Sequence, residues 1–277
     1  MSKLLAGLCQ TPVTADKDKN LEEAGVYIER CAKAGAQLVV LPEMFCCPYQ
    51  SSSFPQYAEK AGGRVYSFLA ETAKKHKVTL VGGSMPELDE AGRIYNTCFI
   101  FDEKGALAGR HRKMHLFDIN IKNGQRFMES ETLSPGNEVT VIETAWGKIG
   151  VMICFDVRFP ELARLMTLKG ASALIIPGAF NMTTGPAHWE LTMRARALDN
   201  QVYTLACAPA RDEKGGYVSY GNSMAVTPWG NVLGRLGADA DILLAELDME
   251  QVKAIRNQLP LLSARRCDLY DVVSSAP

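Results

Sequence analysis

The chain has 277 residues, of which 47% are hydrophobic, and its 30 basic side chains nearly balance its 31 acidic ones. A chain of this length can bury a sizeable core as one large domain. It has no basic block and no apolar run near the roughly 20 residues of a membrane span, so neither nucleic acid nor a membrane is an expected partner.

The first third of the chain alternates strand-like apolar runs with helical patterns. Residues 16–35 predict an amphipathic helix, with Leu21, Ala24, Ile28 and Cys31 on one face. A second helix follows, and strands are predicted before, between and after the two helices. These elements are the helix 64–77 and the strands 4–10, 36–43 and 78–84.

The rest of the chain begins with four successive strands and then alternates again. Turn signals separate the first of these strands from the second and the third from the fourth. Strands are predicted over 95–105, 106–117, 139–147, 148–155, 171–180, 201–210, 222–230, 231–237 and 241–248, and helices over 160–170, 186–200 and 249–260.

This mixture of elements predicts a layered α/β protein. Continuous apolar strands such as residues 173–178 indicate sheets that are covered by helices. Because no repeat, low-complexity stretch or shift in composition marks a linker, we expect a single domain over residues 1–277. Residues 118–137 show little periodicity, and a long loop in a compact domain is often an active-site lid.

The cysteine and histidine patterns bear on location and on metals. Eight cysteines are spread along the chain without a Cys-x-x-Cys pair, and the N-terminal segment lacks the pattern of an export signal. These features predict reduced thiols in a cytoplasm. His111 and His115 have the i, i+4 spacing of a zinc helix, but no Glu follows the first His and the segment looks extended. We therefore expect no metal and no cofactor.

Three predicted strands deliver a reactive side chain near their carboxyl ends, namely Glu43, Lys113 and Cys154. In open α/β sheets the ligand crevice lies at this edge. Each residue has an ordinary explanation by itself. Glu43 could be a solvated turn carboxylate, Lys113 a surface ammonium and Cys154 a small core thiol. Together they form a usable set, because a thiol needs a base for its proton and an ammonium stabilises an oxyanion. The backbone N–H of Phe155, just after the turn, is expected to point toward the same oxyanion.

The segments "LPEMF", "RKMHLF" and "CFDVRFPE" resemble, in this order, the three signature segments of the nitrilase superfamily of carbon–nitrogen hydrolases. The resemblance implies a four-layer αββα sandwich. It also implies a triad in which Glu43 is the general base, Lys113 the electrostatic stabiliser and Cys154 the nucleophile. Glu129, in an irregular stretch, matches a second glutamate that positions Lys113 and the substrate.

The resemblance narrows further to the omega-amidase branch, on "KMHLFDI", "ESETLSPG", "PGAFNMTTGPAHWELTMRARALDNQVY" and "ARRCDLY". Members of this branch hydrolyse the terminal amide of 2-oxoglutaramate and 2-oxosuccinamate. The resemblance also implies a homodimer or larger homo-oligomer that pairs through helices, with a C-terminal tail from about residue 260 at the interface. The alternatives are the amidase that repairs deaminated glutathione, which shares a "GPAHWE"-like segment, a nitrilase, and an inactive member kept as a binding partner.

The residues that bind the substrate are less well determined by the sequence. Asn181, Thr183 and His188 follow a strand end, where they could bind a small acid, and Phe180 and Tyr49 are further candidates. Three of these five have an alternative explanation. Thr183 suits a turn ahead of a helix, His188 suits packing on that helix, and Tyr49 suits a plain loop aromatic.

Overall fold

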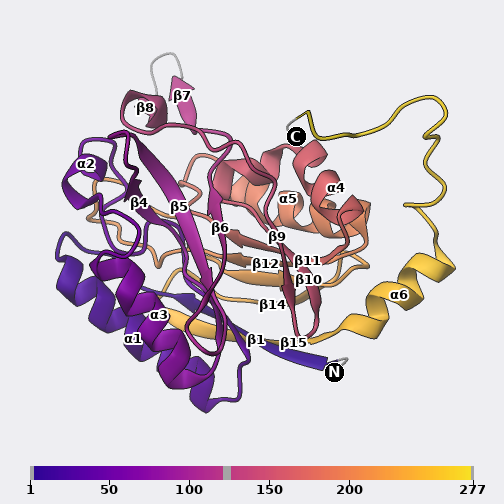
Figure 1. Cartoon of the computed structure of the whole chain (residues 1–277), viewed down its shortest axis with the longest axis horizontal. Helices are drawn as coiled ribbons and strands as arrows, with labels where there is room; N and C mark the ends of the chain where they lie inside the picture. Colours follow the sequence, from indigo (N-terminus) through magenta and orange to yellow (C-terminus); the bar gives the residue numbers. More distant parts are fainter. Residues whose placement is uncertain (1–2, 121–125, 276–277) are drawn as a thin grey trace.

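The computed structural model of the protein describes residues 3–120 and 126–275. Its helices and strands form four layers, with two β-sheets packed face to face and helices on both outer surfaces (Figure 1). The α/β sandwich expected from the sequence is therefore present. No helix among the described residues is long and apolar enough to cross a membrane.

The first sheet has seven strands in the order β15-β1-β2-β3-β5-β4, with β6 also paired to β5. Its central strands β1, β2 and β3 are parallel, so their carboxyl ends share one edge. The strands are β1 Lys3–Gln10, β2 Leu38–Val40, β3 Thr79–Val81, β4 Met85–Leu88, β5 Ile94–Phe101, β6 Leu107–Arg112 and β15 Asp241–Asp248.

The second sheet has six strands in the order β14-β13-β12-β11-β10-β9, of which β10, β11 and β12 are parallel. Every residue of β12 is buried, as expected for a strand that is covered on both faces. The strands are β9 Val141–Thr144, β10 Gly147–Val151, β11 Ala171–Pro177, β12 Tyr203–Cys207, β13 Met224–Val226 and β14 Val232–Arg235.

Four longer helices form the outer layers, with α1 (Lys17–Lys33) and α3 (Arg64–His76) on the first sheet and α4 (Pro160–Leu168) and α5 (Gly185–Asn200) on the second (Figure 1). Asp16 caps α1, because its carboxylate accepts hydrogen bonds from the free backbone N–H groups of the first turn. The helices α4 and α5 each begin with a proline in the first turn, where no backbone N–H is needed.

The inner faces of the two sheets share one apolar core. The thiol of Cys207 on β12 lies 3.3 Å from the backbone oxygens of Cys9 and Val40 in the first sheet, so a polar contact also joins the sheets. A second core packs α1 and α3 onto the outer face of the first sheet. This packing brings the carboxyl ends of the parallel strands of both sheets together.

The structure differs from the predicted elements chiefly around residues 118–137. Instead of an irregular loop, Asp118–Asn120 (β7) and Arg126–Met128 (β8) pair as a two-stranded sheet, and a 3-10 turn, Glu129–Glu131 (η1), follows. Residues 121–125 of the predicted lid lie outside the described residues. The sequence pattern also missed β4 and the short helix α2 (Phe54–Tyr57), because each is only four residues long.

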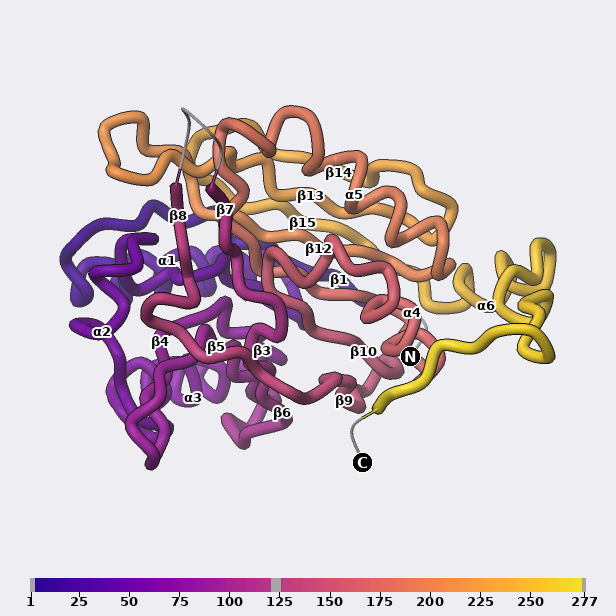
Figure 2. The backbone as a smooth tube through the Cα atoms, turned by 90° about the horizontal axis from the view of Figure 1, so that it is seen from above, coloured from indigo at the N-terminus to yellow at the C-terminus, as the bar shows by residue number. Residues whose placement is uncertain are grey.

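The helix α6 (Met249–Gln258) extends away from the two sheets, and the segment after it curves back toward the body (Figures 1 and 2). This tail carries large apolar side chains that are exposed, among them Leu269 and Tyr270 at 70% and 60%.

Candidate active site

The three residues that the sequence singled out lie just beyond strand ends. Glu43 follows the last residue of β2 by three positions, Lys113 follows β6 by one and Cys154 follows β10 by three. The predicted strands were therefore too long at this edge. The chain leaves the sheet pairing before each residue, which allows its side chain to turn into the space between the sheets.

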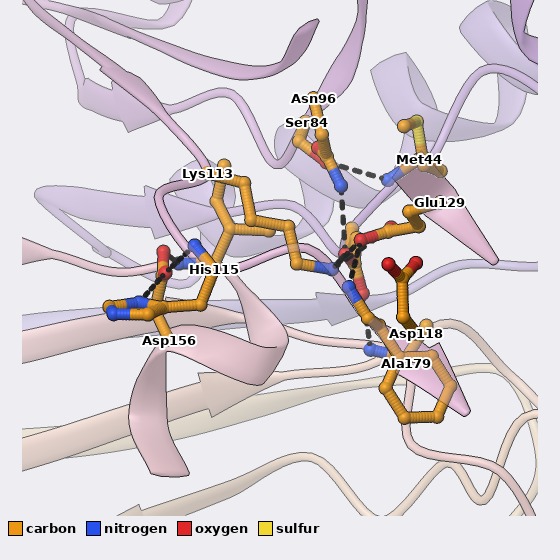
Figure 3. A network of polar contacts seen from close by, with 12 residues as sticks. Met44, Ser84, Asn96, Lys113, His115, Asp118, Glu129, Asp156 and Ala179 are labelled. Atoms are coloured by element: carbon orange, nitrogen blue, oxygen red, sulfur yellow. Dashed lines mark hydrogen bonds and ion pairs between the residues drawn. The ribbon is translucent and has the colours of Figure 1, made fainter. Parts of the chain in front are cut away.

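Lys113 is fully buried between two carboxylates. Its ammonium lies 2.9 Å from Glu43 Oε1 and 2.9 Å from Glu129 Oε2. Figure 3 shows the Lys113 side chain reaching toward Glu129. Burial by itself lowers the pKa of a lysine, but Glu129 and Glu43 outweigh this effect and raise the pKa of Lys113 above its usual value. The side chain is therefore a fixed cation.

Glu43 is held on both carboxylate oxygens. Its Oε1 accepts hydrogen bonds from Lys113 and from the Asn96 amide at 2.9 Å, and its Oε2 accepts one from the backbone N–H of Ala179 at 2.9 Å. Burial raises the pKa of Glu43, an effect that Lys113 opposes and that the charge of Glu129 reinforces. A carboxylate with a raised pKa is suited to take up and return a proton near neutral pH.

Glu129 is completely buried, in contrast to the irregular stretch expected from the sequence. Its Oε1 accepts a hydrogen bond of 2.7 Å from the Tyr49 hydroxyl, and its Oε2 accepts one of 2.7 Å from the backbone N–H of Phe117. Both oxygens thus have protein donors besides Lys113. The Tyr49 ring stacks on Phe127 with centroids 5.2 Å apart, which fixes the hydroxyl in place.

Cys154 begins a 3-10 turn, Cys154–Arg158 (η2), and has a positive φ of 46°. Such a backbone is strained for a residue with a side chain, and it makes a sharp bend that exposes the thiol to the cleft. Burial raises the pKa of the Cys154 thiol well above its usual value, and the neighbouring Glu43 raises it further. The resting group is therefore a thiol, which needs a base, and the neighbouring Glu43 carboxylate is the candidate for it.

Asp156, which the sequence analysis did not single out, fastens this turn to the segment that carries Lys113. One carboxylate oxygen accepts from His111 and the backbone N–H of Ile153, and the other accepts from the backbone and ring of His115. In Figure 3 Asp156 and His115 lie beside Lys113. Burial raises the pKa of a carboxyl, but the two histidines reverse the effect, so the pKa of Asp156 lies well below its usual range. His111 and His115 are therefore both hydrogen-bond partners of the Asp156 carboxylate.

A narrow pocket of about 10 Å³ adjoins the Cys154 thiol. The Arg158 guanidinium lies in its wall, over the Phe180 ring at 4.6 Å and 3.1 Å from His188 Nδ1. Among the described residues no carboxylate forms an ion pair with Arg158. The pocket is lined by Phe117, Cys154, Phe155, Arg158, Ala179, Phe180, Asn181, Thr184 and Tyr217.

The predicted substrate-binding residues are distributed unevenly around this pocket. Phe180 and Asn181 line it, but Thr183 does not: it is exposed, and its backbone N–H bonds to the Asn181 side chain in the turn before α5. His188 is exposed and does not line the pocket, but its ring contacts Arg158, which does. Tyr49 lines a different cavity, together with Glu43.

Sequence reasoning also missed three other residues of the site. Asn96 could have been suspected as a polar residue inside an apolar strand, and Arg158 stands in the same motif as Cys154. Tyr217, whose hydroxyl donates to the Ala179 carbonyl, gave no signal, because it comes from a loop far along the chain.

Comparison with known proteins identifies the family of the chain. Residues 5–257 match the family model of the carbon–nitrogen hydrolases. The chain is 50% identical to omega-amidase NIT2 of Xenopus tropicalis over 98% of both chains. The crystal structure of Nit3 of Saccharomyces cerevisiae, a member of branch 10 of the nitrilase superfamily, superposes with a TM-score of 0.88 at 45% identity, covering 96% of this chain and 97% of that one.

An amidase from Nesterenkonia sp. AN1 is also similar, with a TM-score of 0.78 and 25% identity over 96% of this chain and 95% of that one. In that structure the acetamide moiety of fluoroacetamide is covalently added at the active-site cysteine. The match of the family model over most of the chain and the identity to relatives over its full length lead to one assignment: the chain belongs to the carbon–nitrogen hydrolase family, within the nitrilase superfamily.

Proposed function

We propose that this protein is an omega-amidase, which hydrolyses the terminal amide of 2-oxoglutaramate or 2-oxosuccinamate to the 2-oxo dicarboxylate and ammonia. The observation that carries the proposal is Arg158. Its guanidinium is a cation that has no acidic partner among the described residues. It lies in the wall of the pocket beside the Cys154 thiol. A substrate with an amide at one end and a carboxylate at the other matches that pair of groups. The name of the Xenopus tropicalis relative supports the same substrate class.

In the first half of the reaction, Glu43 removes the proton from the Cys154 thiol as the sulfur attacks the amide carbon. The oxygen of the tetrahedral intermediate is stabilised by the Lys113 ammonium and the backbone N–H of Phe155. Glu43 then passes its proton to the amide nitrogen, the C–N bond breaks, and ammonia leaves a thioester on Cys154. The raised pKa of Glu43 suits both transfers.

In the second half, Glu43 removes a proton from water, and the resulting hydroxide attacks the thioester carbon. The C–S bond breaks, and Glu43 returns the proton to the Cys154 sulfur, so that the acid and the free thiol are formed. Glu129 contacts Lys113 and not the thiol, so its proposed role is to position the ammonium. The β7–β8 sheet is proposed to act as a lid, because Phe117, next to β7, lines the pocket.

The substrate class is tested by ammonia release from 2-oxoglutaramate, deaminated glutathione, glutamine and a nitrile, measured side by side. We expect a clear preference for 2-oxoglutaramate, and a preference for deaminated glutathione would contradict the proposal. Replacing Arg158 by Met should lower kcat/KM for 2-oxoglutaramate about 10- to 100-fold, because a hydrogen bond to a charged group contributes about 1.5–3 kcal/mol.

The matched controls are Arg158→Lys, which keeps the charge and should retain part of the activity, and pentanamide, which has no distal carboxylate. Arg158→Met should affect turnover of pentanamide much less than turnover of 2-oxoglutaramate. An equal loss with both amides would mean that Arg158 does not bind the carboxylate.

We further propose that the whole chain acts as one domain that forms a cytoplasmic homodimer through α5 and the tail. The outer side of α5 exposes Leu191 at 68% and Leu198 at 45%, and the tail exposes Leu269 and Tyr270. Apolar side chains gathered on one surface are typical of an interface. Light scattering of the native protein should give twice the chain mass, and Leu191→Glu combined with Leu198→Glu should give a monomer. A native monomer at assay concentration would contradict the dimer.

A further inference from the structure

A second cavity, of about 80 Å³, is lined by Glu43 and adjoins the Cys154 pocket, because Ala179 and Tyr217 line both spaces. It is bounded by residues that follow the carboxyl ends of parallel strands from both sheets: Val13 after β1, Glu43 after β2, Ala179 after β11 and Ala210 after β12. A cavity needs about 10–15 Å³ to hold one water, so this cavity can hold several waters.

The walls of this cavity carry several polar groups among apolar ones. Besides Glu43, the polar residues include Tyr49, Gln50, Asp212 and Ser219. A water in a cavity needs about two to four polar partners, whereas a wholly apolar cavity stays dry. The polar residues of the lining can supply such partners.

Two residues separate the cavity from the Cys154 pocket. Ala179 and Tyr217 line both spaces, and the Tyr217 hydroxyl donates to the Ala179 carbonyl, which closes the wall between them. Cys154 lines only the narrow pocket, and Glu43 lines only the larger cavity. The Glu43 carboxylate accepts a hydrogen bond from the backbone N–H of Ala179, which lines both spaces, so the carboxylate lies next to the wall between them.

This arrangement bears on how water reaches the thioester. The pocket beside Cys154 has room for about one water in this structure, and the acyl group occupies that side once the thioester has formed. The base that must activate the water faces the other space. A supply of water from the cavity would not require the acyl group to move.

We propose that this cavity is the binding site of the hydrolytic water, which reaches the thioester along the Glu43 carboxylate and not through the substrate pocket. The inference rests on the proposed function, because it concerns the second half of that reaction. Water bound on the cavity side gives a proton to Glu43, its oxygen forms the new C–O bond, the C–S bond breaks, and the proton ends on the Cys154 sulfur.

The test narrows the cavity at two of its lining residues, with Val13→Phe and Ala210→Phe as separate variants. Neither residue belongs to the proposed catalytic or substrate-binding set. The matched control is Val26→Phe, at an exposed position of α1 that does not line the cavity. Rapid-quench mass spectrometry follows the formation and loss of the acyl adduct on Cys154, with 2-oxoglutaramate and, in parallel, acetamide.

In both cavity variants the adduct should form at close to the native rate and disappear about tenfold more slowly, within the range of about 10²-fold that a small misplacement of a reactant can cost. The control should behave like the native protein. Native rates of adduct loss in both variants would overturn the proposal, and so would a raised KM with native adduct loss, which would mean that the cavity binds the acyl chain. Equal slowing of both steps would also overturn it.

The same measurement on the native protein distinguishes a failure of this inference from a failure of the proposed function. If it forms no adduct with either amide, the proposed reaction itself is wrong. If it forms an adduct with acetamide alone, the substrate class is wrong, but the cavity variants still test the route of the water.

Discussion

Cys154→Ala should abolish ammonia release, with no residual turnover above background, while the protein remains folded. The variant removes the atom that forms the thioester, and no other cysteine lines the narrow pocket. Alanine at this position meets the same backbone strain as cysteine, because the φ of 46° is unfavourable for both. The side chain lost is small, so little cavity is created. Circular dichroism and thermal unfolding should therefore match the native protein.

The complementary measurement is labelling of the thiols by iodoacetamide. Seven cysteines are buried and Cys267 is exposed in the tail, so a Cys267→Ser background removes the side chain that would react first without affecting activity. In this background the loss of activity should follow the modification of Cys154 alone. Because the thiol depends on Glu43 for deprotonation, Glu43→Gln should slow the labelling. Peptide mapping that shows an inactivated protein with unmodified Cys154 would contradict the assignment of the nucleophile.

The sequence predicted the edges of the sheets at which the site is built, because an apolar run followed by a polar residue is a local signal. Glu43, Lys113 and Cys154 could be found in this way, and most helices and longer strands could be found from their periodicity. Each strand was predicted three to five residues too long at this edge, because the predicted strands end at residues 43, 117 and 155 and the observed ones at 40, 112 and 151. The apolar pattern continues there, because Met152 and Ile153 are buried although they no longer pair as part of a strand.

What the sequence could not predict is which distant segments meet at these edges. Asp156 has the appearance of a turn residue until His111 and His115 are seen to approach it from another sheet. Tyr217 and Ala210 become walls of a cavity only through the packing of loops that are far apart in the chain. The interior position of Glu129 likewise depends on the hydroxyl of Tyr49, 80 residues away in the sequence.

The second large effect is expected from the different roles of the two glutamates in the reaction. Glu43→Gln should slow the reaction by about 10² to 10⁴, the usual contribution of a proton-transfer group. Glu129→Gln should slow it less, because Glu129 positions Lys113 and moves no proton. Glutamine is not a neutral replacement at either position, since both oxygens of each carboxylate accept hydrogen bonds from N–H or O–H donors. In each variant the NH₂ group of the glutamine faces another hydrogen-bond donor, which should cost about 1–3 kcal/mol of the free energy of unfolding.

The pH dependence separates proton transfer from this structural cost. Burial holds the pKa of Glu43 above the ordinary glutamate value of 4.5, and only its ionised form can take a proton. The native kcat/KM should therefore fall as the pH is lowered through that raised pKa. Glu129→Gln removes a negative charge near Glu43, which is one cause of the raised pKa, so the acid limb should remain but move to lower pH.

Glu43→Gln should lose this limb, because the titrating base is gone. Single-turnover kinetics with mass spectrometry should show an acyl adduct that forms slowly and then persists. The outcome that overturns the assignment is a Glu43→Gln variant that acylates and deacylates at native rates with the native acid limb. The base would then be another group, and Glu129 would be the first candidate, because it is the other carboxylate in contact with Lys113.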